Sequence, residues 1–116
     1  MGGVISFSDS AENTWLVAGW AFRQVLADVS RQYGNDNELV EKLELAELHG
    51  GLMLQRLEPS LAARIEAGIT NVVTGILGGV IPSGITEQPY GDQRTVQQYM
   101  ESLEDLMRIL HRSRAH

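Results

Sequence analysis

Carboxylates are the side chains of this 116-residue chain whose spacing could support chemistry. They form two series, at Glu38, Glu41, Glu44 and Glu47 and at Glu101, Glu104 and Asp105. Carboxylate oxygens are the ligands that Mg²⁺ takes from proteins, provided that they converge on one point. The chemistry that these residues could do is therefore the binding of a divalent cation.

The two series are similar in outline to the acid pattern of the all-α nucleotide pyrophosphohydrolases. That family holds magnesium between two neighbouring helices, with Glu-Glu-x-x-Glu on one and Glu-x-x-Asp on the other. This chain has no adjacent pair of glutamates, and it has Glu101-x-x-Glu104 in place of Glu-x-x-Asp. A spacing of three residues also drifts by about 60° per step around a helix, so Glu38 and Glu47 point to opposite sides. Solvated helix faces are our first interpretation, and a metal site at Glu44, Glu47 and Glu101 is the alternative.

A second stretch that could do chemistry is His49-Gly50-Gly51, which lies inside a run of leucines. It is similar to the His-Gly-Gly segment that supplies oxyanion-hole amides in lipase-like α/β hydrolases. That activity also needs a strand-to-helix loop and a Gly-x-Ser-x-Gly nucleophile elbow, and we identify neither in the sequence. The three histidines do not have the spacing of a ligand set. We therefore predict no catalytic residue, no cofactor and no enzymatic activity.

Glu47 is the acid with the most unusual expected position, because it projects into the apolar arc between Val40 and Leu54. A buried carboxylate must find hydrogen-bond donors or take up a proton. We expect a structural ion pair with a residue such as Arg64, and a functional acid is the alternative.

Composition sets limits on the partners of this chain. The 43% apolar and 21% charged fractions are typical of a soluble globular protein, and we expect one domain over residues 1–116. A net charge of −6 argues against nucleic acid as a partner and permits a protein with a basic surface. The absence of cysteine fits the cytoplasm. The uncharged stretch 67–86 is interrupted by Pro82 and Gly84, so we predict a buried core helix and no association with a membrane.

The elements that must position these residues are predicted to be helices. Apolar residues recur at helical spacing in four segments, at about 10–33, 37–57, 60–81 and 93–112. We therefore predict an all-α bundle of four principal helices. Asn35 or Asp36 is expected to cap the second helix, Pro59 or Ser60 to begin the third, and Asp92 to cap the fourth. Residues 1–9 would form a short arm that either packs across the bundle or pairs as a strand with a partner chain.

The second helix is the least certain element because it contains Gly50 and Gly51. The apolar arc that includes Leu39 and Leu43 keeps its phase through the glycines to Leu57, which favours one continuous helix. A break at the glycines would instead give five helices.

More apolar surface is predicted than a four-helix bundle obviously needs. Leu16 and Trp20 fall outside the main stripe of the first helix, and Leu45, Leu48 and Leu52 form a second stripe on the next helix. Aromatic and apolar anchors of this kind are typical of protein interfaces, although a more complex internal packing could also bury them. The acids Glu38, Glu41, Glu101 and Asp105 would then face a basic partner.

These patterns together favour a small, acidic, non-enzymatic protein-binding module. An immunity or antitoxin-type inhibitor of a bacterium or phage fits the pattern, and so does a regulatory adaptor. A homodimer is a further expectation. The alternative is a metal-dependent all-α nucleotide hydrolase that uses acids on the second and fourth helices.

Overall fold

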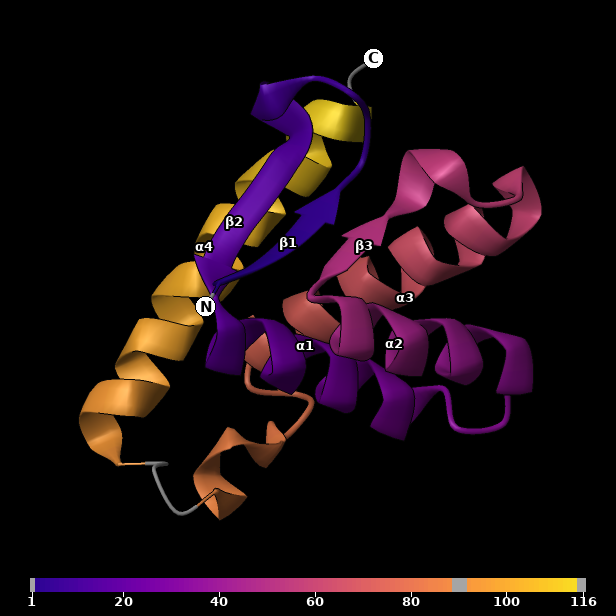
Figure 1. Cartoon of the computed structure of the whole chain (residues 1–116). Coiled ribbons are helices and arrows are strands. Elements are labelled where there is room, and N and C mark those ends of the chain that lie inside the picture. Colours follow the sequence, from indigo (N-terminus) through magenta and orange to yellow (C-terminus); the bar gives the residue numbers. More distant parts are fainter. Residues whose placement is uncertain (1, 89–91, 115–116) are drawn as a thin grey trace.

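The computed structural model describes residues 2–88 and 92–114, and in these ranges it contains four α-helices and a small three-stranded sheet (Figure 1). The helices are α1 (Gly19–Gln32), α2 (Asn37–His49), α3 (Pro59–Leu77) and α4 (Gln93–Arg114). The strands are β1 (Gly2–Ser6), β2 (Thr14–Ala18) and β3 (Gly51–Met53). Three short 3₁₀ segments complete the described part, namely η1 (Ala11–Asn13), η2 (Leu54–Arg56) and η3 (Gly84–Glu87).

The sheet makes the fold α+β, so the prediction of an all-α bundle is wrong. The strand order is β2-β1-β3, with β1 antiparallel to β2 and parallel to β3. Ile5 on the central strand lies between Trp15 of β2 and Leu52 of β3, and all three side chains are buried. A strand of this length gains stability only by pairing with segments that are remote in sequence. The spacing of apolar residues within one short stretch of sequence does not indicate such pairing.

The predicted N-terminal arm and the predicted first helix differ most from the structure. Residues 2–6, expected in the N-terminal arm, form the central strand of the sheet inside the same chain. The first helix begins at Gly19 and not near residue 10, because 14–18 is an extended strand. Trp15, which falls within the predicted first helix, is instead buried on the inner face of β2, where its Nε1–H donates to the Ser102 carbonyl at 3.1 Å.

Gly50 ends α2, so the prediction of one helix over 37–57 is also wrong. Gly50 has a φ of 73°, and its N–H bonds to the Ala46 carbonyl as a left-handed cap. The chain then enters β3 directly and does not form a fifth helix. Leu54 is buried and Leu57 is partly buried against the core, which explains why the apolar phase continued through the glycines. A buried strand followed by a 3₁₀ turn placed apolar residues at positions that a helix would also have used.

The starts of the later helices agree with their sequence signals. The Asp36 carboxylate accepts from the Leu39 N–H at 3.1 Å, and the Asp92 carboxylate accepts from the Thr95 N–H at 2.8 Å. Pro59 is the first residue of α3, where its missing N–H has no cost. The end of α3 is at Leu77, earlier than the predicted residue 81.

The core lies between the helices and one face of the sheet. Ile5 and Trp15 from the sheet join a single hydrophobic cluster with residues of α1, α2, α3 and α4, such as Phe22, Ile69 and Leu106. Figure 1 shows β2 crossing over α4 while the other face of the sheet is left open. Within the described residues, none of the helices is both long enough and apolar enough to cross a membrane.

A glycine at position 50 is required by the backbone, so we predict that Gly50→Ala lowers the free energy of unfolding by about 1 kcal/mol. A left-handed φ is costly for any residue with a Cβ, even though a Cβ at Gly50 would meet only the Gly2 carbonyl, at 4.0 Å. Urea unfolding of the variant measures the change. Gly34→Ala is the control, since Gly34 is exposed without a positive φ, and an equal loss there would contradict the backbone explanation.

Candidate functional site

The most polar buried position of the molecule is Asp28 on α1, whose carboxylate is 3% exposed. Its Oδ1 accepts from the Gln24 side-chain amide at 3.1 Å and from the Gly84 N–H at 2.9 Å. Its Oδ2 accepts from the Ser83 hydroxyl at 2.7 Å and from the Tyr99 hydroxyl at 2.8 Å. The donors come from α1, from the turn that begins η3, and from α4. One carboxylate therefore connects three segments that lie up to 71 residues apart.

This arrangement resembles an acid–base site in its residue types, but its bonding is that of a structural anchor. A carboxylate has about four acceptor positions, and all of those on Asp28 are occupied by protein donors. The Tyr99 hydroxyl is equally committed. Its burial, followed by the charge of Asp28 and their hydrogen bond, raises the pKa of Tyr99 far above its usual value near 10. A substrate would have to displace these bonds to reach either group.

Asp28 is not among the residues that we predicted from the sequence to be buried or functional. The available signal was its place on α1, one turn before Gln32 and one turn after Gln24, at the edge of the arc that includes Val25 and Val29. An acid at the edge of an apolar arc indicates a buried carboxylate in need of donors. Its partners, Ser83 and Tyr99, could not be identified from helical spacing, because they lie on other segments.

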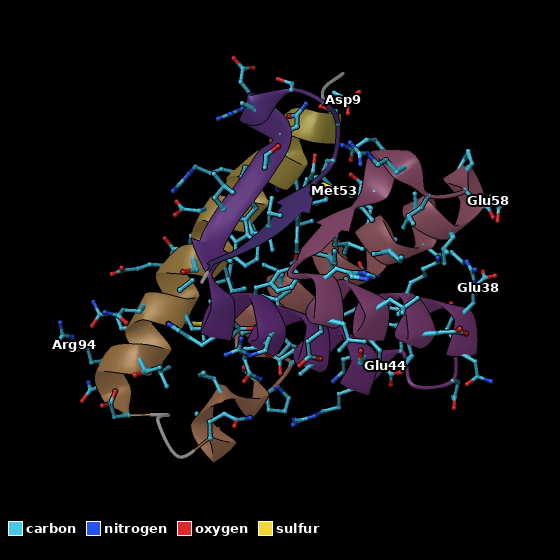
Figure 2. The ribbon with its side chains drawn as sticks, in the orientation of Figure 1. Asp9, Glu38, Glu44, Met53, Glu58 and Arg94 are labelled. Atoms are coloured by element: carbon cyan, nitrogen blue, oxygen red, sulfur yellow. The ribbon has the colours of Figure 1, made fainter. Side chains whose placement is uncertain are left out.

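The outer face of α2 is the first candidate interaction surface. Leu48 is 81% exposed and Leu45 is 39% exposed, and the spacing of the helix places Glu41 and Glu44 on the same face. Figure 2 shows Glu44 along this helix, with Glu38 nearer its N-terminal end. The predicted second stripe is thus exposed at two of its three leucines. Leu52 is a correction, since it lies in β3 and is 3% exposed.

Charge on this face is unevenly compensated. Arg64 of α3 bonds to Asp36 at 2.9 Å and also forms an ion pair with Glu38, so two acids at the start of α2 share one cation. Glu41, Glu44 and Glu47 make no ion pair in the part of the chain that the structure describes. Because Glu47 is exposed and Arg64 is engaged elsewhere, the predicted buried pair between them is wrong.

The alternative metal site does not assemble in the described ranges. Glu44 and Glu47 lie on α2, whereas Glu101 lies on α4 and accepts from the Gln97 side chain at 3.4 Å. Asp105 forms an ion pair with Arg108, one turn along the same helix. No group of three or more potential ligands from histidine, aspartate and glutamate could hold a metal ion among residues 2–88 and 92–114.

The second candidate surface is the edge strand β2. Leu16, which was predicted to be a partner-binding residue, is 78% exposed on it. Trp20 lies just beyond the strand and is half-buried, with its ring 6.3 Å from that of Tyr99. Trp20 therefore belongs largely to the packing of α1 on α4, and Leu16 is the more exposed apolar group at this edge.

The hollows of the surface differ in size and lining, and one of about 420 Å³ lies on α4 beside Met107, Arg108, His111 and Arg112. One of about 230 Å³ lies between α2 and β3 beside Leu45, and one of about 150 Å³ lies beside Leu48. Pockets for small molecules usually measure about 300–1,000 Å³. A larger hollow of about 350 Å³ lies between η2 and α3, but Glu66 is the one titratable residue that lines it.

Comparisons of the chain with protein-family models, with curated proteins and with solved structures gave no match.

We predict that Asp28→Ala lowers the free energy of unfolding by at least about 3 kcal/mol, because four buried donors lose their acceptor. Chemical denaturation measures the loss. Asp36→Ala serves as the control and should cost about 1 kcal/mol, since it removes a helix cap and an exposed ion pair. Equal losses for the two variants would contradict the anchoring role of Asp28.

The raised pKa of Tyr99 predicts a loss of stability in alkali. The folded chain holds the phenolic proton more tightly than the unfolded chain, so this contribution is complete below pH 10 and declines above it. The decline amounts to at most about 1.4 kcal/mol per pH unit. Urea unfolding between pH 8 and pH 11 should show a steeper fall for the wild type than for Tyr99→Phe.

Tyr33→Phe is the matched control for the alkaline experiment. The Tyr33 hydroxyl accepts a hydrogen bond from the Asn71 side chain in an exposed position. This variant should keep the steep alkaline fall of the wild type. The same slope in all three proteins would show that Tyr99 ionises as easily in the folded chain as in the unfolded one.

Proposed function

We propose that this protein is a binding module that recognises a basic protein surface through the outer face of α2. The observation that carries the proposal is the pair of exposed leucines, Leu45 and Leu48, next to Glu41, Glu44 and Glu47, which form no ion pair within the described residues. Burial of an exposed leucine stabilises a complex by about 1.5–3 kcal/mol. The same residue in water contributes nothing to the fold.

The charges support a basic partner. Glu41, Glu44 and Glu47 lie around the leucines, with Lys42 and Arg56 lining the hollow beside Leu45, and the whole chain has a net charge of −6. Opposite fields accelerate encounter and disfavour acidic competitors, while apolar anchors slow dissociation. A partner with an apolar recess surrounded by lysine or arginine fits this face in both respects.

An inhibitor or regulatory adaptor is the role that we propose for such a module. A small acidic domain can cover a basic functional surface of its target without any chemistry of its own, as an immunity or antitoxin-type protein does. Residence in the cytoplasm is part of this proposal and is supported by the absence of cysteine from the sequence.

Affinity capture with quantitative comparison of variants tests the proposal. We expect Leu48→Lys to reduce capture of the partner at least about tenfold, because the anchor is lost and the local charge becomes less negative. Val80→Lys is the matched control, since Val80 is 82% exposed in the connection after α3. Capture that is equal for both variants would contradict a binding role for α2.

A second pair of variants separates steering from anchoring. Glu41→Gln combined with Glu44→Gln should mainly slow association with the captured partner and weaken its dependence on salt. Leu48→Ala should mainly accelerate dissociation. Surface plasmon resonance at two salt concentrations resolves the two effects, and an association rate that does not respond to the loss of both acids would exclude a basic partner.

A further inference from the structure

The open edge of β2 offers backbone groups that the fold does not use. The Val4 N–H donates to the Gly50 carbonyl at 3.3 Å, so the backbone groups of Val4 face β3. Val4 is opposite Leu16 in the antiparallel register. Residues opposite each other in such a pair both point toward their partner strand or both point away from it. The N–H and carbonyl of Leu16 therefore point away from β1, into the open edge.

A second bond confirms this alternation. The Phe7 N–H donates to the Asn13 carbonyl at 2.9 Å, which continues the same register by one pair beyond Ser6 and Thr14. Odd-numbered residues of β2 thus face β1, and Thr14, Leu16 and Ala18 face outward. Figure 1 shows β2 on the outside of the sheet, with α4 behind it.

The sequence of this edge strand carries none of the residues that usually protect against pairing. Natural edge strands carry lysine, proline, a bulge or a covering segment. The sequence of β2, Thr-Trp-Leu-Val-Ala, contains no charge and no proline. Leu16 in its centre is 78% exposed. The other edge strand, β3, has three residues and passes directly into η2, so β2 is the longer template.

We infer that the β2 edge pairs with the β2 edge of a second copy of this chain, antiparallel and centred on Leu16. The two sheets then form one continuous sheet across a two-fold axis, as closed homodimers require. The two Leu16 residues exchange a pair of hydrogen bonds, and their exposed side chains meet on the open face. Each Ala18 N–H donates to the Thr14 carbonyl of the other copy.

This register uses the groups that remain free. The Thr14 N–H is already bonded to the Ala11 carbonyl, and Ala18 is the N-cap of α1, where a carbonyl accepts the first bond of the helix. A copy centred on Leu16 needs the Thr14 carbonyl and the Ala18 N–H, and it leaves those two committed groups undisturbed.

Charge at the ends of β2 favours the same arrangement. Glu12 precedes the strand and Arg23 follows it on α1, and both are exposed. Neither side chain forms an ion pair within the described residues, since Arg112 donates to the Glu12 carbonyl and not to its carboxylate. An antiparallel copy places Glu12 of one chain at the same end as Arg23 of the other. Opposite charges are thus brought to the same end of the shared edge, once on each side of the two-fold axis.

Sedimentation of the purified chain over a range of concentrations tests the pairing, independently of the α2 face. We expect a reversible dimer whose dissociation constant rises at least about tenfold in Leu16→Lys, because a charge on an open edge opposes its own copy. Val80→Lys, at a similarly exposed site, should leave the constant unchanged. Circular dichroism verifies that each variant is folded. A wild-type chain that stays monomeric, or a dimer that tolerates Leu16→Lys, would overturn the inference.

A charge swap tests the antiparallel register without altering β2. Glu12→Arg and Arg23→Glu should each weaken the dimer several-fold, because each brings like charges together at both ends. The double variant should recover most of the wild-type dissociation constant. A double variant as weak as the single variants would overturn the register. This experiment and the capture experiment on α2 use different residues, so either result can fail alone.

Discussion

The buried carboxylate of Asp28 is the interaction on which the arrangement of this fold most depends. An ionised group without water is tolerated only where donors replace its hydration, and Asp28 obtains four of them from three segments. Since Ser83 and Gly84 donate through the turn after α3 and Tyr99 donates through α4, the bond network fixes both segments against α1. Apolar contact alone is not directional and would allow the turn after α3 and helix α4 to slide against α1.

This anchoring commits the polar groups around Asp28 to the structure, and the surfaces that we propose for binding lie on the outside of the molecule. The donors around Asp28 have no spare capacity, so the site is closed to a substrate. Trp20 packs on the ring of Tyr99 beside that network, which turns an expected surface anchor into part of the packing between α1 and α4. The apolar groups left in water are on β2, on α2 and in the connection after α3.

The two proposed surfaces differ in the physics of recognition. On α2, side chains would provide both the anchor and the steering charge, so the partner is defined by chemistry. On β2, backbone groups would provide most of the bonding, so the partner is defined by geometry, and an identical strand satisfies that geometry by symmetry. A dimer formed through β2 would present two α2 faces and could engage a partner more strongly than one chain.

The sequence by itself determined the features that depend on neighbouring residues. The helix starts at Asp36, Pro59 and Asp92 were predictable because a cap acts within one turn. The acidity around α2 also followed from composition, whereas the sequence left open whether Leu16, Leu45 and Leu48 are exposed or buried. The tertiary structure decided the rest.

The strands pair Gly2–Ser6 with Thr14–Ala18 and with Gly51–Met53, and this pairing converted Leu52 from a surface residue to a core residue. Three of the four donors to Asp28 lie 55 to 71 residues away. The physical reason is common to both: strand pairing and the solvation of a buried charge are satisfied across the chain. A stretch of sequence as long as one helix contains only one strand of such a pair, or the buried charge without most of its donors.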